Sequence, residues 1–166
     1  MSGPLTRFGL AVAAVVCVLD QAIKLWLIFA FDLGARGLVR LGPGIDLVLT
    51  WNAGISYGLF PQGSAAGRWF LTGIAAAAVI VLTIWLTRIQ TRLTALALGL
   101  IIGGAVGNAI DRLAYGAVAD FVLLHLTTAS WRFEWYVFNV ADAAIVAGVV
   151  GLLYESLIRD RAAKAP

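Results

Sequence analysis

The sequence predicts a membrane α-helical fold, with four transmembrane helices joined to a small extracytoplasmic platform rich in β-structure. The 166-residue chain is 61% hydrophobic and 13% charged, whereas a soluble domain is roughly 45–50% apolar and about 25% charged. Its mean hydropathy is +0.93, and its few charged residues divide the chain into long apolar stretches. These observations exclude an ordinary soluble enzyme, a disordered chain and a coiled coil.

Four apolar stretches are each long enough for a helix that crosses a hydrocarbon core of about 30 Å, which takes roughly 17–25 residues. Their approximate bounds are residues 8–31, 69–87, 93–111 and 136–155. Backbone polar groups in lipid must be satisfied within the segment, so each span is expected to be helical. We expect residues 1–166 to form a single integral membrane domain.

The density of Lys and Arg predicts the orientation of the spans. The N-terminus, the short 88–92 loop and the tail after Glu155 carry their cations in short segments, where the positive-inside rule is reliable. Both termini are therefore expected in the cytoplasm, with segments 32–68 and 112–135 on the opposite side. Within the first of these segments, residues 45–51 mix β-branched and aromatic residues, which is typical of a strand.

Ionisable residues inside a membrane are costly, and each is therefore a candidate for function. The predicted topology places four carboxylates in or near the outer leaflet, namely those of Asp20, Asp111, Asp120 and Asp142. On this reading Asp142 lies seven residues into the last span, about 10 Å deep. Four of the nine acidic residues in the chain therefore share one depth, which indicates a site.

The cations near these carboxylates divide them into two groups. Lys24 lies at i+4 from Asp20, on the same helix face, and Arg112 follows Asp111, so we expect two structural ion pairs. The other two carboxylates, of Asp120 and Asp142, have no cation within helical reach. Two close carboxylates in a low dielectric share one proton. One can then activate water while the other polarises a carbonyl group.

Other kinds of site are less well supported by the residues. His125 is the only histidine and has no i+4 partner for a metal site, so we expect a structural role for it. Ser56 and Ser130 have no nearby His or Lys base. The cations form no basic run, which argues against nucleic-acid binding. The glycines of residues 103–107 are expected to allow close helix packing.

Five short motifs in this order resemble those of the bacterial lipoprotein signal peptidase (signal peptidase II) family. The motifs are Asp20-Gln-Ala-Ile-Lys24, Asn52-Ala-Gly54, Gly107-Asn108-Ala-Ile-Asp111-Arg112, Asp120-Phe121 and Phe138-Asn139-Val-Ala-Asp142. They span residues 20–142, nearly all of the expected fold. The two longest are specific, because each places Asn and Asp at helical spacing inside an apolar segment.

The resemblance implies an aspartyl endopeptidase of the bacterial inner membrane, with a periplasmic β-cradle, a small helix near the membrane surface and no metal or other cofactor. It implies cleavage of diacylglyceryl prolipoproteins just before the lipidated Cys, contact with membrane lipid, and inhibition by globomycin-type compounds. We expect a monomer with its active site at the periplasmic face.

The resemblance also implies a role for each residue of the site. The catalytic dyad would be Asp120 and Asp142. Substrate-binding positions would be Asn52, Gly54, Asn108, Arg112 and Asn139, and Asp20, Lys24 and Asp111 would support the site.

From the residues alone, two other classes of protein remain. Buried Asp and Lys also serve proton relays, so a proton-coupled membrane transporter is the alternative. A non-catalytic assembly protein, with its polar residues holding helices together, is the third.

Overall fold

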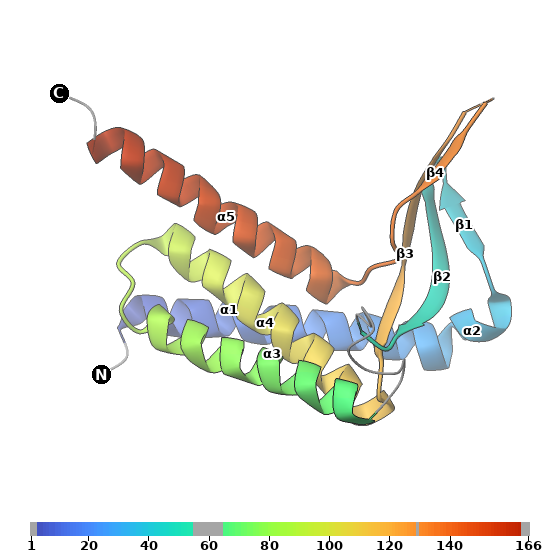
Figure 1. Cartoon of the computed structure of the whole chain (residues 1–166), viewed down its shortest axis with the longest axis horizontal. Helices are drawn as coiled ribbons and strands as arrows, with labels where there is room; N and C mark the ends of the chain where they lie inside the picture. The colour runs from blue at the N-terminus through green and yellow to red at the C-terminus, as the bar shows by residue number, and fades with distance from the viewer. Residues whose placement is uncertain (1–2, 55–64, 129, 164–166) are drawn as a thin grey trace.

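The computed structural model describes residues 3–54, 65–128 and 130–163. It shows a bundle of long helices with an antiparallel sheet at one end of the bundle (Figure 1). The elements in chain order are α1 (Pro4–Leu25), a π-helical turn η1 (Trp26–Ala30), α2 (Leu33–Arg36), β1 (Val39–Gly42), β2 (Ile45–Asn52), α3 (Ala65–Leu86), α4 (Arg92–Tyr115), β3 (Val118–Thr127), β4 (Arg132–Glu134) and α5 (Val140–Ala163).

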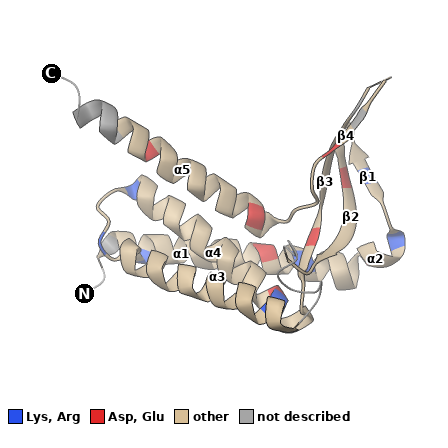
Figure 2. Ribbon diagram, viewed as in Figure 1, with Lys and Arg blue, Asp and Glu red and all other residues tan. Residues whose placement is uncertain are grey.

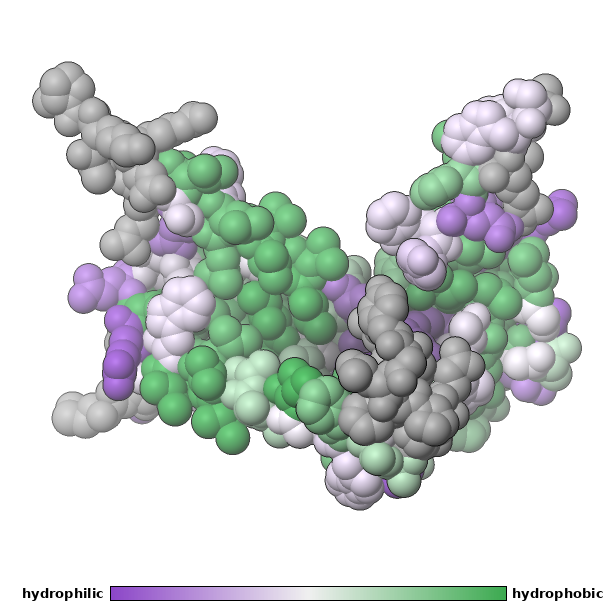
Figure 3. Space-filling view, viewed as in Figure 1, coloured by the Kyte–Doolittle hydropathy of each residue, from purple (hydrophilic) through white to green (hydrophobic). Residues whose placement is uncertain are grey.

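Within the described residues, four helical stretches are long and apolar enough to cross a membrane. They are Leu5–Ala30, Ala65–Leu86, Arg92–Tyr115 and Val140–Ile158. Charged residues gather toward the two ends of the bundle (Figure 2), and apolar side chains cover its visible face between those ends (Figure 3). Lipid is the solvent that such a surface needs. The prediction of four transmembrane helices is confirmed, and the chain is a multi-pass membrane protein.

Helix α4 is the centre of the bundle and packs against α1, α3 and α5. The contacts are close because glycines line them. A methyl group on Gly103 would collide with the carbonyl of Ala13 in α1, and one on Gly104 with the carbonyl of Ala141 in α5. Small residues let helix backbones approach closely within a membrane. The expected role of these two glycines in packing is confirmed.

The four strands form one antiparallel sheet in the order β1-β2-β3-β4. The predicted strand at residues 45–51 is confirmed as β2, and the expected β-rich platform is this sheet. Its register places Asp120 of β3 opposite Thr50 of β2, two residues before Asn52. The end of β2 and the start of β3 therefore lie where the sheet meets the helices.

The last helix begins later than the sequence predicts. Residues 136–139 are not helical, because Phe138 forms an antiparallel bridge with Val122 of β3, through backbone hydrogen bonds of 2.8 and 3.0 Å. Helix α5 starts only at Val140. The predicted position of Asp142 in the helix was therefore wrong, since this residue lies in the first turn of α5 and not seven residues into the helix.

Candidate active site

The deepest part of the site is a buried lysine with three oxygen partners. Lys24 Nζ lies 2.8 Å from Asp20 Oδ2 and 2.8 Å from Asp111 Oδ2, and it donates to Asn108 Oδ1 at 3.2 Å. The lysine side chain is 2% exposed, and the two carboxylates are 0% and 1% exposed. The three protons of the ammonium group are matched by three acceptors, which a buried cation requires.

The carboxylate of Asp111 shows that one predicted ion pair was wrong. Its partner is Lys24 and not the adjacent Arg112, because neighbouring residues of a helix point about 100° apart. Asp111 Oδ2 also accepts from the Ala119 amide at 3.1 Å. The predicted pair between Asp20 and Lys24 is confirmed, so one lysine serves both carboxylates.

Two groups that the sequence analysis missed complete this cluster. Gln21 Nε2 lies 2.8 Å from Asp111 Oδ1 and 3.2 Å from the Gly107 carbonyl. The backbone amide of Ala141, in the first turn of α5, donates to Asp20 Oδ1 at 2.9 Å. The position of Gln21, next to Asp20 in an apolar span, could have identified it as part of the site. The contact of Ala141 depends on how α5 packs against α1 and could not be seen in the sequence.

Asp120 is buried on β3 and held by two asparagines. Its Oδ2 accepts from Asn52 Nδ2 at 3.0 Å, and its Oδ1 accepts from Asn139 Nδ2 at 2.6 Å. Burial, reinforced by the negative charge of Asp142, raises the pKa of Asp120 to about 6, against the lowering effect of the asparagine hydrogen bonds. This carboxyl group is therefore suited to hold a proton that an ordinary aspartate would lose.

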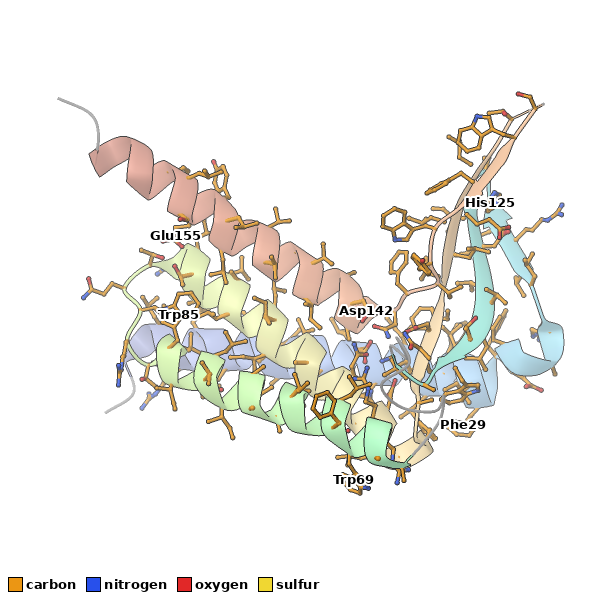
Figure 4. All side chains as sticks on the ribbon, viewed as in Figure 1. Phe29, Trp69, Trp85, His125, Asp142 and Glu155 are labelled. Atoms are coloured by element: carbon orange, nitrogen blue, oxygen red, sulfur yellow. The ribbon has the colours of Figure 1, made fainter. Side chains whose placement is uncertain are left out.

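Asp142 belongs to a reciprocal cap at the start of α5 (Figure 4). Its Oδ2 accepts from the backbone amide of Asn139 at 3.2 Å, and its own amide donates to Asn139 Oδ1 at 2.9 Å. Its Oδ1 accepts from Asn108 Nδ2 at 2.8 Å. The arrangement is a capping box, and the positive end of the helix dipole favours a negative charge there.

The asparagines that donate to the two carboxylates are themselves oriented by other groups. Asn108 Oδ1 accepts from Lys24 and from Asn139 Nδ2 at 3.1 Å, so the amide nitrogen of Asn108 must face Asp142. Asn139 Oδ1 is taken by the Asp142 amide, which turns the nitrogen of Asn139 toward Asp120. The amide network therefore joins the lysine cluster to both remaining carboxylates.

Asn52 is oriented by the loop that follows β2. Its Oδ1 accepts from the Gly54 amide at 2.9 Å, in the two-residue pattern of an Asx turn, and its nitrogen is left for Asp120. Gly54 has φ +101°, and a Cβ atom there would collide with Leu71 of α3. The turn therefore needs glycine for its backbone conformation.

Arg112 lies beside Asp120 and Asp142, which form no ion pair among the described residues. It interacts electrostatically with Asp142 and Asp120, and its Nη1 donates to the Asn108 carbonyl at 3.4 Å. Its Nε is buried without a hydrogen-bond partner. The guanidinium group is therefore a cation in direct electrostatic range of both carboxylates.

A cleft of about 700 Å³ opens beside Asp120, between the sheet and the segment that leads to α5. In the space-filling view a deep notch separates α5 from the β3–β4 side of the molecule (Figure 3). Within the described residues, no group of three or more His, Cys, Asp or Glu side chains is arranged to hold a metal ion. His125 lies 3.1 Å from Asp46 on the sheet, in the structural role expected for it, and Ser56 lies outside the described residues.

The fold and the site define a class of protein: a membrane-embedded aspartic peptidase. A family model described as "Signal peptidase (SPase) II" matches residues 12–158, which is most of the chain. The chain belongs to the signal peptidase II family, the A8 family of peptidases. This membership decides against the transporter and the assembly protein that the residues alone left open.

Curated relatives and solved structures agree with this assignment. A lipoprotein signal peptidase of Nitrobacter hamburgensis is 59% identical over 160 residues, which cover 96% of this chain and 98% of the relative. One from Methylorubrum extorquens is 58% identical over 91% of this chain and 86% of the relative. A solved bacterial membrane enzyme matches the fold with a TM-score of 0.75 at 23% identity, over 96% of this chain and 92% of that one. A second matches with a TM-score of 0.74 at 23% identity, over 91% and 93%.

Proposed function

We propose that Asp120 and Asp142 are the catalytic dyad of a lipoprotein signal peptidase, which cleaves diacylglyceryl prolipoproteins just before the lipidated Cys. One observation carries this proposal. Within the described residues, both carboxylates are held by amide donors and form no ion pair. The negative charge of Asp142 acts on Asp120, and two carboxylates that interact in this way tend to hold one proton between them. One shared proton supplies an acid and a base together.

The environments of the two carboxylates support different roles. Asp142, at the positive end of a helix, is the base that takes a proton from water as the water attacks the scissile carbonyl carbon. Asp120, whose pKa is raised to about 6, is protonated and donates to the carbonyl oxygen. Asp142 then gives its proton to the amide nitrogen while a hydroxyl group of the tetrahedral intermediate returns a proton to Asp120, so that the C–N bond breaks and the dyad regains its starting state. The products are a free carboxyl group on the signal peptide and a free amine on the Cys.

The residues around the dyad are proposed to position the substrate. Arg112 is a cation beside both carboxylates, and a guanidinium group in this place suits the carbonyl of the scissile peptide or of the residue before it. Gly54 and Asn52 border the cleft beside Asp120, where an extended substrate chain is proposed to lie. Asn108 and Asn139 keep the carboxylates oriented, and because both are buried they are proposed to act on the substrate through the dyad.

The proposed location is the bacterial inner membrane, with both termini in the cytoplasm and the dyad at the periplasmic face. Cations in the short loop between α3 and α4 and near the termini support this orientation. The enzyme is proposed to act as a monomer, without a cofactor, on a substrate that reaches it from the surrounding lipid. Globomycin-type compounds are proposed to bind at the dyad.

The direct test is a gel-mobility assay with purified enzyme and a prelipidated prolipoprotein, with and without globomycin. The expected result is a product shortened by the signal peptide, with a new N-terminus at the lipidated Cys, and a block by globomycin. Cleavage at another residue would contradict the proposed substrate specificity. Thiol labelling of single cysteines introduced at each terminus, in intact and opened cells, tests the orientation.

A further inference from the structure

A second cavity, of about 650 Å³, lies at the end of the bundle opposite the candidate active site. It is formed by the end of α3, the loop between α3 and α4, the first turn of α4 and the C-terminal half of α5. Glu155, which lines it, is about 20 Å from Asp142 along α5. Trp85 and Glu155 mark this end of the bundle in Figure 4, and Asp142 marks the other. The cavity is therefore separate from the cleft beside Asp120.

The acidic side chain of this cavity is engaged within the protein. The two carboxylate oxygens of Glu155 accept hydrogen bonds from the hydroxyl groups of Thr91 and Thr94. Thr91 is the N-cap residue of α4 and Thr94 lies in its first turn, where the positive end of the helix dipole offsets a negative charge. Glu155 therefore joins α5 to α4 and is not the group that would bind a ligand.

Arg88 provides a cation at the same cavity. It lies two residues beyond the end of α3 and is exposed, and it forms no ion pair among the described residues. Its backbone amide donates to the Trp85 carbonyl at 2.9 Å, which fixes the turn that leads out of α3. A guanidinium group carries five N–H donors in a planar fork that matches the oxygens of a phosphate group.

The rest of the cavity wall is largely apolar and lies at the boundary of the membrane. Arg88 is in the short loop between the spans Ala65–Leu86 and Arg92–Tyr115, at the level expected for lipid headgroups. Tryptophan is enriched at this level in membrane proteins, and Trp85 is 45% exposed. The apolar residues that line the cavity are Trp85, Ile89, Leu93 and Ile158. A cation beside an apolar wall complements a phosphate group that carries acyl chains.

We propose that this cavity binds an anionic phospholipid of the leaflet opposite the candidate active site, with the lipid phosphate held by Arg88. Basic pockets between transmembrane helices on the cytoplasmic side of a membrane bind the headgroups of anionic lipids, and the proposed orientation puts the cavity on that side. Helices α3 and α5 both pack on α4, and the lipid fills the space between their ends. The proposal concerns the stability of the bundle and not the hydrolysis step.

The test measures binding of phosphatidylglycerol to the full-length protein in detergent, by native mass spectrometry. Arg88→Gln is expected to weaken this binding about tenfold, because a charge-assisted hydrogen bond to the phosphate is lost. Added phosphatidylglycerol should raise the Tm of the wild type and have much less effect on this variant. The side chain of Arg88 makes no hydrogen bond or ion pair with the other described residues, so the substitution should leave the fold intact.

A matched control separates a site from a general attraction of anionic lipid to a cationic protein. Arg92→Gln makes the same charge change at another exposed arginine, which is four residues away and does not line the cavity. This variant should bind phosphatidylglycerol as the wild type does. Equal binding by the wild type and Arg88→Gln would overturn the proposal, and so would equal weakening by the two substitutions.

Two further ligands distinguish a phospholipid from its parts. Dioleoylglycerol lacks the phosphate group and should bind weakly, and inorganic phosphate lacks the acyl chains and should not displace phosphatidylglycerol. If dioleoylglycerol binds as tightly as phosphatidylglycerol, the cavity is only an apolar groove. If millimolar phosphate displaces the lipid, the cavity is a site for a soluble anion. Either result would overturn the proposal, and neither bears on the proposed peptidase activity.

Discussion

The site contains two pairs of carboxylates with opposite surroundings. Asp20 and Asp111 share one ammonium group, with both ion-pair distances at 2.8 Å. Asp120 and Asp142 are held by side-chain and backbone amides and take part in no ion pair among the described residues. Each pair lies where helices meet the sheet, so depth alone does not distinguish them.

The comparison teaches that a direct ion pair distinguishes a structural acid from a reactive one, since Arg112 lies near the second pair without forming one. A carboxylate in an ion pair with a buried lysine serves the fold, because its oxygens are occupied and its removal would leave the lysine without a partner. A carboxylate held only by amides can gain or lose a proton without breaking an ion pair. Asn108 contacts both kinds, since it accepts from Lys24 and donates to Asp142.

The largest effect is expected from removal of charge at the second pair. Asp120→Asn and Asp142→Asn should each lower the rate of prolipoprotein cleavage by about a thousandfold or more, because the acid or the base is lost. Single-turnover assays measure the rate, and thermal unfolding in detergent shows whether the variant is folded. A folded Asn variant that cleaves at the wild-type rate would exclude that residue from the dyad.

Removal of the lysine that the first pair of carboxylates shares should affect the fold instead. Lys24→Met leaves two buried carboxylates without their cation and is expected to lower the free energy of unfolding by about 3–5 kcal/mol. Adding Asp20→Asn and Asp111→Asn to this variant should recover most of the loss. Unfolding in detergent is the measurement. If the single variant is as stable as the wild type, the cluster is not a structural support.

Arg112→Ala sharpens the comparison, because the sequence analysis expected a structural ion pair of Arg112 with Asp111, whereas the family resemblance implies substrate binding. Since Asp111 keeps Lys24 as its partner, the free energy of unfolding should change little. The loss of a charged hydrogen bond to the substrate should lower kcat/KM about 10- to 100-fold. A variant that is strongly destabilised and retains its kcat/KM would reverse this assignment.

The remaining expected effect is a dependence on pH. The pKa of Asp120 is raised to about 6, chiefly by burial, and the proposed mechanism needs this group protonated. Above pH 6 its proton is lost, so kcat/KM should fall by about tenfold for each further pH unit. Assays from pH 5 to 8, with a peptide that has no titratable side chains, test this. A constant kcat/KM over that range would contradict the assigned acid.

Much of the site follows from spacing within single helices. The pair of Asp20 and Lys24 lies one helical turn apart, and the absence of nearby cations singled out Asp120 and Asp142. The ion pair of Asp111 with Lys24 was not predictable in the same way, because it joins α1 to α4. The choice between two nearby cations depends on the direction of each side chain in the folded bundle.

The fold, like the site, could be predicted from the sequence only where local patterns decide it. The spans and β2 were predictable from apolar length and from β-branched residues. The late start of α5 was not, because an apolar and aromatic stretch is as compatible with a membrane helix as with the extended segment that pairs Phe138 with Val122. In both cases a contact between distant parts of the chain overrides the local pattern.

The capping box at the start of α5 has a consequence for mutational surveys. Asp142 accepts a hydrogen bond from the Asn139 backbone, so its side chain holds the end of the helix as well as facing the site. An alanine scan would remove the cap and the carboxylate in one step and could not assign the defect to either. Asparagine keeps an oxygen acceptor for the cap, which makes it the informative replacement at this position.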